Sequence, residues 1–207
     1  MPRLIDISPL VSPRLGVWPG DVPFARAAGL RLEDGASCEL SSIQTTLHLG
    51  AHADAPCHRL RGARPIHVMP LETFYGPCQV VEVRVPRGAR IRPADLRVAV
   101  RAPRVLFKTG TFPDPETFTI DFAGLSPELV ETLHEAGVLL VGIDTPSVDP
   151  FEDERLESHG ALAKRGIVNL EGLVLSGVPA GRYTLVALPL RLEGAEASPL
   201  RAALLAG

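Results

Sequence analysis

Three of the six histidines of this chain crowd into the segment HLGAHADAPCH, from His48 to His58. Positions of one parity hold His48, His52, Asp54 and His58, whereas the alternate positions hold only Leu, Ala and Cys. An extended chain turns successive side chains to opposite faces, so one face would carry the imidazoles and the carboxylate while the other packs on a core. Neutral imidazole and carboxylate are ligands that suit zinc, manganese or iron. The segment therefore predicts a metal site.

The same segment must bend for its histidines to meet. Four residues of straight strand span roughly 13 Å at about 3.3 Å each, whereas an imidazole nitrogen binds its ion at about 2.1 Å. We place the bend at Gly50, which can adopt positive φ, and at the small Ala51. A helix would also bring His48 and His52 together, but the glycine disfavours it, so the extended form is preferred. A carboxylate can bridge two ions, which makes Asp54 the bridging candidate.

The pattern HxGxHxDxPxH resembles the signature of the metal-dependent cyclase family, in particular its bacterial kynurenine formamidase branch. Further similar segments follow in the same order and spacing: Trp18 to Asp21, Gly142 to Ser147, His159, Leu170 to Leu173, Gly181 to Tyr183 and Ala187 to Pro189. The resemblance therefore spans nearly the whole chain. Two departures are Ala51, where many members carry Thr, and Cys57, where a larger aliphatic residue is common. The first points toward the formamidase branch, and the second leaves every ligand position untouched.

The resemblance implies two divalent ions per chain, with zinc as the first expectation and manganese as an alternative. The implied ligands of one ion are His48, His52 and Asp54, and those of the second are Asp54, His159 and Glu171. The residues alone do not pair His159 with Glu171, because they lie twelve positions apart and each by itself is more often structural. The assignment of these two residues therefore rests on the resemblance.

The resemblance also implies hydrolysis of N-formyl-L-kynurenine to L-kynurenine and formate, a step in tryptophan degradation by the kynurenine route. An activated water would be the nucleophile, His58 the general acid/base and Trp18 a substrate contact. A core role for Trp18 fits its WPGD turn equally well. Two other interpretations stay open, namely a hydrolase of another aryl or cyclic amide that resembles isatin hydrolase, and a non-catalytic metal-binding module.

Composition bounds the class of protein and its partners. A chain of 207 residues predicts a single domain over 1–207. The net charge of −3, from 21 basic and 24 acidic residues, argues against nucleic acid as a partner. No stretch reaches the roughly 18 apolar residues of a membrane span, and the first residues do not resemble a secretory signal, so we expect a cytoplasmic protein without a membrane partner. The family resemblance implies a homodimer.

The hydrophobic pattern predicts a mixed α/β domain with more sheet than helix, either barrel-like or in layered sheets. We expect strands over 78–85, 104–110, 138–144 and 183–192, a helix over 126–137 and a second short helix within 153–165. Ser126 can cap the first helix, which together with its flanking strands forms a βαβ unit over 105–143, whereas the remaining strands carry no intervening helix. The family resemblance implies a swivelling β/β/α arrangement.

Overall fold

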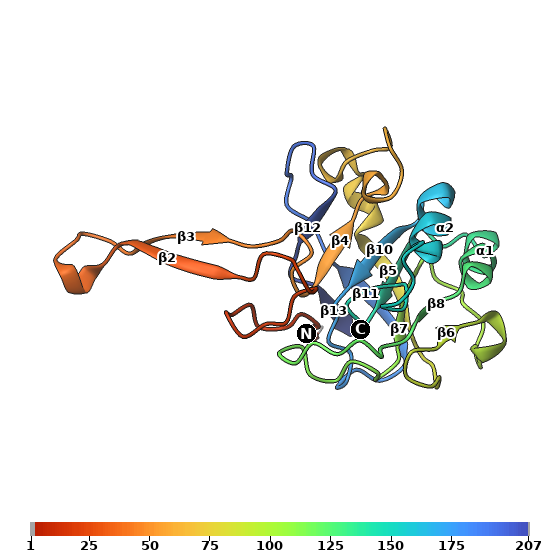
Figure 1. The fold of residues 1–207 in the computed structure, drawn as a ribbon. Helices are drawn as coiled ribbons and strands as arrows, with labels where there is room; N and C mark the ends of the chain where they lie inside the picture. The colour runs from red at the N-terminus through yellow and green to blue at the C-terminus, as the bar shows by residue number, and fades with distance from the viewer. Residues whose placement is uncertain (1–2, 207) are drawn as a thin grey trace.

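A single mixed sheet organises the chain in the computed structural model, which describes residues 3–206. The sheet has nine strands in the order β1-β13-β11-β5-β7-β9-β10-β4-β12 and curls across the molecule (Figure 1). Its strands are β1 (Arg3–Asp6), β4 (His52–Asp54), β5 (Tyr75–Glu82), β7 (Arg104–Lys108), β9 (Leu140–Ile143), β10 (Val168–Glu171), β11 (Gly181–Val186), β12 (Ala197–Pro199) and β13 (Ala203–Ala206). Only two α-helices accompany them, so the sheet-rich α/β class is confirmed for the described residues.

The centre of the sheet is parallel and its flanks are antiparallel. Strands β5, β7, β9 and β10 run parallel to one another, whereas β4 pairs antiparallel with both β10 and β12. Helix α1 (Pro127–Glu135) connects β7 to β9 and forms the expected βαβ unit. Ser126 caps it by accepting a hydrogen bond from the Leu129 amide, and Gly137 follows its end with φ +77°. The cap, the apolar face and the terminal glycine are the features that predict this helix.

Two of the sequence-based expectations for the elements were wrong. Helix α2 (Glu157–Arg165) connects β9 to the parallel strand β10, so a second βαβ unit exists where we expected none. The strand expected over 183–192 begins earlier and ends at Val186. Its second half contains Pro189, which has no amide hydrogen to donate to a neighbouring strand.

The sheet has a hydrophobic cluster on each side. One cluster joins α1 and α2 to the sheet through residues such as Leu129, Leu162 and Val141. The other contains Ala53 of β4 together with Leu170 and Phe74. Because neighbouring residues of a strand face opposite sides, Val105 and Leu106 of β7 belong to different clusters. The site described below is therefore built on a sheet supported on both faces.

Two further pairs of strands accompany the nine-stranded sheet. Strands β2 (Ala25–Leu30) and β3 (Leu40–Gln44) form an antiparallel hairpin that projects far from the body (Figure 1). We call residues 25–44 the arm. Strands β6 (Arg90–Ile91) and β8 (Gly124–Leu125) form a short parallel pair beside α1. Among residues 3–206, no helix has the length and apolar character needed to cross a membrane.

Candidate metal centre

The histidine-rich segment folds as its alternating pattern predicts. Leu49, Ala51, Ala53 and Ala55 are all buried, each at most 3% exposed, and the three alanines belong to the core cluster beneath β4. The bend at Gly50 is also confirmed, because this residue has φ +52°. The segment then passes through β4 into a short 3-10 turn over Pro56–His58. The polar side chains of the segment are thus left on the face opposite the core.

The pairing of β10 with β4 brings residues from distant parts of the chain onto the same surface. In the antiparallel register, Glu171 lies opposite His52 and Asn169 lies opposite Asp54. Residues opposite each other on one face of a sheet have Cβ atoms within about 5.5 Å, so their side chains can meet. The remaining histidine, His159, comes from helix α2. All five residues expected to bind metal therefore gather in one cluster.

Both carboxylate oxygens of Asp54 face histidines, but different ones. Its Oδ1 lies 3.1 Å from Nδ1 of His48 and 3.5 Å from Nε2 of His52. Its Oδ2 lies 3.3 Å from Nε2 of His159. Glu171 completes the cluster, with Oε2 3.3 Å from Nε2 of His52 and Oε1 3.1 Å from Nε2 of His159. Asp54 therefore stands between two halves of the cluster, one with His48 and His52 and the other with His159.

Several ligand atoms lie close enough together to share an ion. His52, Asp54 and Glu171 offer three atoms within 4.8 Å of one another, and so do His48, Asp54 and His58. Among the described residues, buried Nε2 of His52 and Oδ1 of Asp54 have no hydrogen-bond partner. Buried polar atoms are almost always satisfied, and these two point into the cluster. This donor set fits a divalent cation.

Groups outside the cluster hold two of the histidine rings. Nδ1 of His52 lies 2.9 Å from the Gly50 carbonyl oxygen, which fixes Nδ1 as the donor and turns Nε2 toward the cluster. Nδ1 of His159 lies 2.8 Å from Oδ2 of Asp149, a carboxylate that also accepts a bond of 2.8 Å from Arg90. Metal-binding histidines are commonly held in this way through their second nitrogen. Asp149 and Arg90 are not evident from the sequence, because no spacing rule connects them to His159.

The charges of the cluster stabilise each other. Burial by itself would lower the pKa of His52, but the carboxylates of Glu171 and Asp54 outweigh it and raise this pKa to about 9. The pKa of His159 is likewise raised well above its usual value, against burial, by Glu171, Asp149 and Asp54. Burial and Asp54 would raise the pKa of Glu171, yet the neighbouring histidines lower it to about 2. Without an ion, the cluster therefore holds protonated histidines between ionised carboxylates.

His58 lies at the edge of the cluster. Its ring centroid is 4.5 Å from that of His48 and 5.5 Å from that of His159. Burial and the neighbouring histidines lower its pKa, although Asp54 opposes them. His58 is therefore neutral near pH 7 and can accept a proton. Because His58 is also in one of the two candidate triads, its role outside the ion sites stays a prediction.

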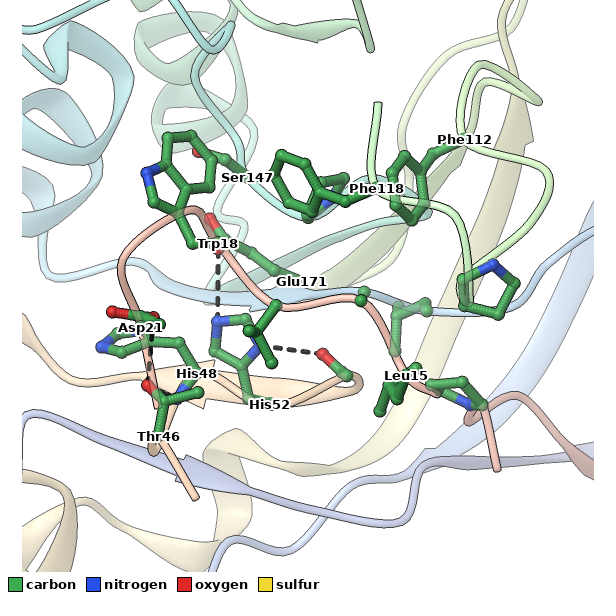
Figure 2. Close-up of a pocket in the computed structure, with 18 of the residues that line it drawn as sticks. Leu15, Trp18, Asp21, Thr46, His48, His52, Phe112, Phe118, Ser147 and Glu171 are labelled. Carbon is green, nitrogen blue, oxygen red and sulfur yellow. Dashed lines mark hydrogen bonds and ion pairs between the residues drawn. The ribbon is translucent and has the colours of Figure 1, made fainter. Parts of the chain in front are cut away.

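A cavity of about 500 Å³ opens above the cluster. His48, His52, His58, His159 and Glu171 line it from the cluster side. In Figure 2, Trp18, Phe118 and Phe112 stand in a row on the opposite side. The ring of Trp18 stacks on Phe151 at 4.9 Å and meets Phe118 edge to face at 5.6 Å. Trp18 thus packs against other aromatic rings and lines the cavity, whereas its contact with substrate stays a prediction.

The fold and the cluster together define an α/β protein whose histidine and carboxylate side chains could bind divalent ions beneath an aromatic cavity. The chain belongs to the Cyclase family, whose model matches residues 5–150.

Its relatives extend over nearly the full length of the chain. It is 45% identical to the kynurenine formamidase of Salinibacter ruber, covering 97% of this chain and 96% of the relative. It is 43% identical to the kynurenine formamidase of Bordetella petrii, covering 99% and 98%. A solved structure described as a potential metal-dependent hydrolase with cyclase activity is 27% identical, with a TM-score of 0.84, and the match covers 99% of this chain and 98% of that one. Isatin hydrolase A of Labrenzia aggregata shares the fold at 21% identity, with a TM-score of 0.81 over 99% of this chain and 93% of that one.

Proposed function

We propose that this protein is an arylformamidase that hydrolyses N-formyl-L-kynurenine to L-kynurenine and formate. The observation that carries the proposal is the buried cluster of histidines and carboxylates at the floor of an aromatic-lined cavity. Two relatives above 40% identity over nearly the whole chain bear the name kynurenine formamidase and support the same substrate. The substrate has an aryl ring next to the formamide, which suits the row of aromatic side chains.

The ions would be held in two sites that share Asp54. We assign His48 and His52 to the first site, and His159 and Glu171 to the second, with zinc or manganese as the ion. The unpartnered Nε2 of His52 and Oδ1 of Asp54 support the first site. The second is supported by Nε2 of His159, which lies 3.3 Å from Oδ2 of Asp54 and 3.1 Å from Oε1 of Glu171. Divalent ions, when bound, would supply Lewis-acid activation of a water molecule and of the formyl carbonyl group.

We assign His58 the movement of the proton. Attack of water on the formyl carbon forms a C–O bond and releases a proton, and cleavage of the C–N bond requires a proton on the departing nitrogen, because an arylamine leaves poorly as an anion. A neutral His58 can take the first proton and return it to the nitrogen. Its lowered pKa and its place on the cavity wall support this assignment. The products are formic acid, which ionises to formate, and L-kynurenine.

Trp18 and the aromatic row would bind the aryl ring of the substrate. Trp18, Phe112 and Phe118 line the cavity on the side that faces the histidines (Figure 2). A ring held between them would leave the formamide directed toward His58 and the cluster. Offset or edge-to-face contacts with aromatic rings contribute about 0.5–1.5 kcal/mol each beyond area burial.

The decisive experiment combines an activity assay with a count of bound ions. We would load metal-free protein with zinc or manganese, measure ions per chain by elemental analysis and follow hydrolysis of N-formyl-L-kynurenine, formanilide and isatin. The proposal expects activity on the formamides that rises with ion content. Hydrolysis of isatin alone would instead indicate the cyclic-amide alternative, and a loaded protein inactive on all three would contradict the proposal.

We also propose that two copies of the chain form a homodimer through the arm. Every residue of β2 and β3 is exposed in the single chain, and the apolar side chain of Ile43 is 66% exposed. An isolated two-stranded hairpin is marginally stable in water and usually needs something to pack against. A second copy would cover Ile43 and the face of β3 to which it belongs.

A further inference from the structure

Asn169 occupies a special place beneath the cluster. It is only 5% exposed, and its side-chain amide donates both hydrogens to carboxylates. Nδ2 lies 2.8 Å from Oδ2 of Asp54 and 3.0 Å from Oε1 of Glu171. No aspect of the sequence pattern singled out this residue. The register of the sheet explains the contact, because Asn169 lies directly opposite Asp54 and two residues before Glu171 on the same face of β10.

The amide fits this place for an electrostatic reason. Asp54 and Glu171 are both buried and both ionised, so they repel each other. A side chain that donates a hydrogen bond to each carboxylate offsets this repulsion. A hydroxyl has only one hydrogen to donate, and a third carboxylate would add repulsion, whereas an amide NH2 group supplies two donors and is neutral.

The amide also fixes how both carboxylates are turned within the cluster. Oε1 of Glu171 accepts a second bond of 2.8 Å from the Val148 amide, so this oxygen is held from two sides. The other oxygen, Oε2, is left facing His52. On Asp54, Asn169 holds Oδ2, whereas Oδ1 has no hydrogen-bond partner and faces His48 and His52. The amide thus keeps the Asp54 carboxylate turned so that it presents one oxygen to each half of the cluster.

We infer that Asn169 is a positioning residue that allows this chain to hold two ions rather than one, by fixing Asp54 in its bridging orientation. This inference rests on the metal sites of the proposed function. Without the amide, Asp54 can rotate and give both oxygens to a single ion, so that the second site loses its shared ligand. Loss of a group that hydrogen-bonds to a metal ligand typically weakens metal binding by about 10–100-fold.

Calorimetric titration of metal-free protein with zinc, and separately with manganese, tests this role without relying on activity. We would compare the wild-type chain with Asn169→Leu, which has a similar shape but no donor, and with Asn169→Ser, which keeps one donor. We expect two ions per chain in the wild type. In Asn169→Leu we expect one ion at near wild-type affinity and the second weakened about 10–100-fold, with a smaller loss in Asn169→Ser.

A matched control separates positioning from stability. Val168 precedes Asn169 on β10 and is buried in the core away from the carboxylates, so Val168→Ala should lower the melting temperature without changing the stoichiometry. If Asn169→Leu folds poorly, the Asn169→Ser titration decides. Two ions bound at wild-type affinity in the Asn169 variants would overturn the inference and leave the proposed function intact. A wild-type chain that binds no ion at all would overturn both.

Discussion

At the scale of single residues, the contrast between His58 and its neighbours matters most. His52 and His159, within the cluster, have raised pKa values because they contact carboxylates, whereas burial lowers that of His58. A group that must accept and release a proton near neutral pH needs a pKa close to or below that range. The family resemblance implies that His58 is the general acid/base, and the structure adds a physical reason for a neutral imidazole at this place.

Replacing His58 with Ala should lower kcat by roughly 10²–10⁴-fold, the usual contribution of a general acid/base. Because the pKa of His58 is lowered from its ordinary value of 6.5, the acid limb of kcat/KM in the wild type should fall below that pH, and this limb should disappear in His58→Ala. Steady-state kinetics across the acid and neutral range, with ion content measured in parallel, provide the check. A variant that loses its ions together with its activity would instead identify His58 as a ligand.

Removal of the ions with a chelator should make the stability of the fold depend on pH. The pKa of His52 is about 9 in the metal-free fold and about 6.5 in an unfolded chain. The stabilisation from protonated His52 is therefore fully present below about pH 6.5 and lost as the pH rises to about 9. We expect the melting temperature of metal-free protein to fall over this window. The loaded protein should lack this decrease, because ions bind neutral histidine more tightly as the pH rises, and parallel decreases would contradict the assignment.

At the scale of elements, the bend before β4 depends on two glycines in contact. Gly50 and Gly172 both have positive φ, and a Cβ on Gly172 would collide with the carbonyl oxygen of Gly50. Gly172 follows Glu171 directly, so this contact sets the distance between the bend and β10. The close approach of two backbones holds His52 against Glu171.

Gly172→Ala should therefore destabilise the fold by about 2–4 kcal/mol, through left-handed strain and overpacking. It should also weaken ion binding, because the bend is pushed away from Glu171. Gly177→Ala is the matched control, since a methyl group there would meet no atom within 4 Å and its φ is not positive. Denaturant unfolding and elemental analysis of both variants measure the effects. Wild-type ion content in a destabilised Gly172→Ala would show that the bend does not control the cluster.

The sequence predicts those features of the elements that are set by residues close together in the chain. The alternation around β4 and the cap of α1 arise from neighbouring residues, and both were confirmed. The start of α2 is different, because Asp149 accepts bonds from the amides of Ser158 and His159 nine and ten residues later. The helix expected within 153–165 is confirmed, and Asp153 accepts a bond from the Glu157 amide, but the sequence does not indicate the contact with Asp149. Glu171 meets His52 because of the register between β10 and β4, and sequence spacing does not encode strand register. Before the structure, only the family resemblance indicated that Glu171 belongs to a metal site with His159.

At the scale of the whole molecule, the arm and the cavity are connected. The arm leaves the body after Asp21 and returns at Thr46, and both residues line the cavity. Thr46 Oγ1 donates to Oδ2 of Asp21 at 3.1 Å (Figure 2). The Thr46 amide donates to the Val22 carbonyl oxygen at 2.9 Å. These bonds close the base of the arm beside His48. A partner that holds the arm would therefore also stabilise one wall of the cavity.

The proposed dimer gives the last prediction. Ile43→Asp places a charge on the exposed apolar surface of the arm, where a central contact is worth about 2 kcal/mol or more, so the dimer dissociation constant should rise at least roughly 30-fold. Ser42→Asp adds the same charge at the adjacent polar position on the other face of β3 and should have little effect. Light scattering across a dilution series measures the mass of each protein, and circular dichroism reports whether the fold is retained. A wild-type chain that remains a monomer at every concentration, or an Ile43→Asp variant that dimerises as tightly as Ser42→Asp, would show that the arm does not join two copies.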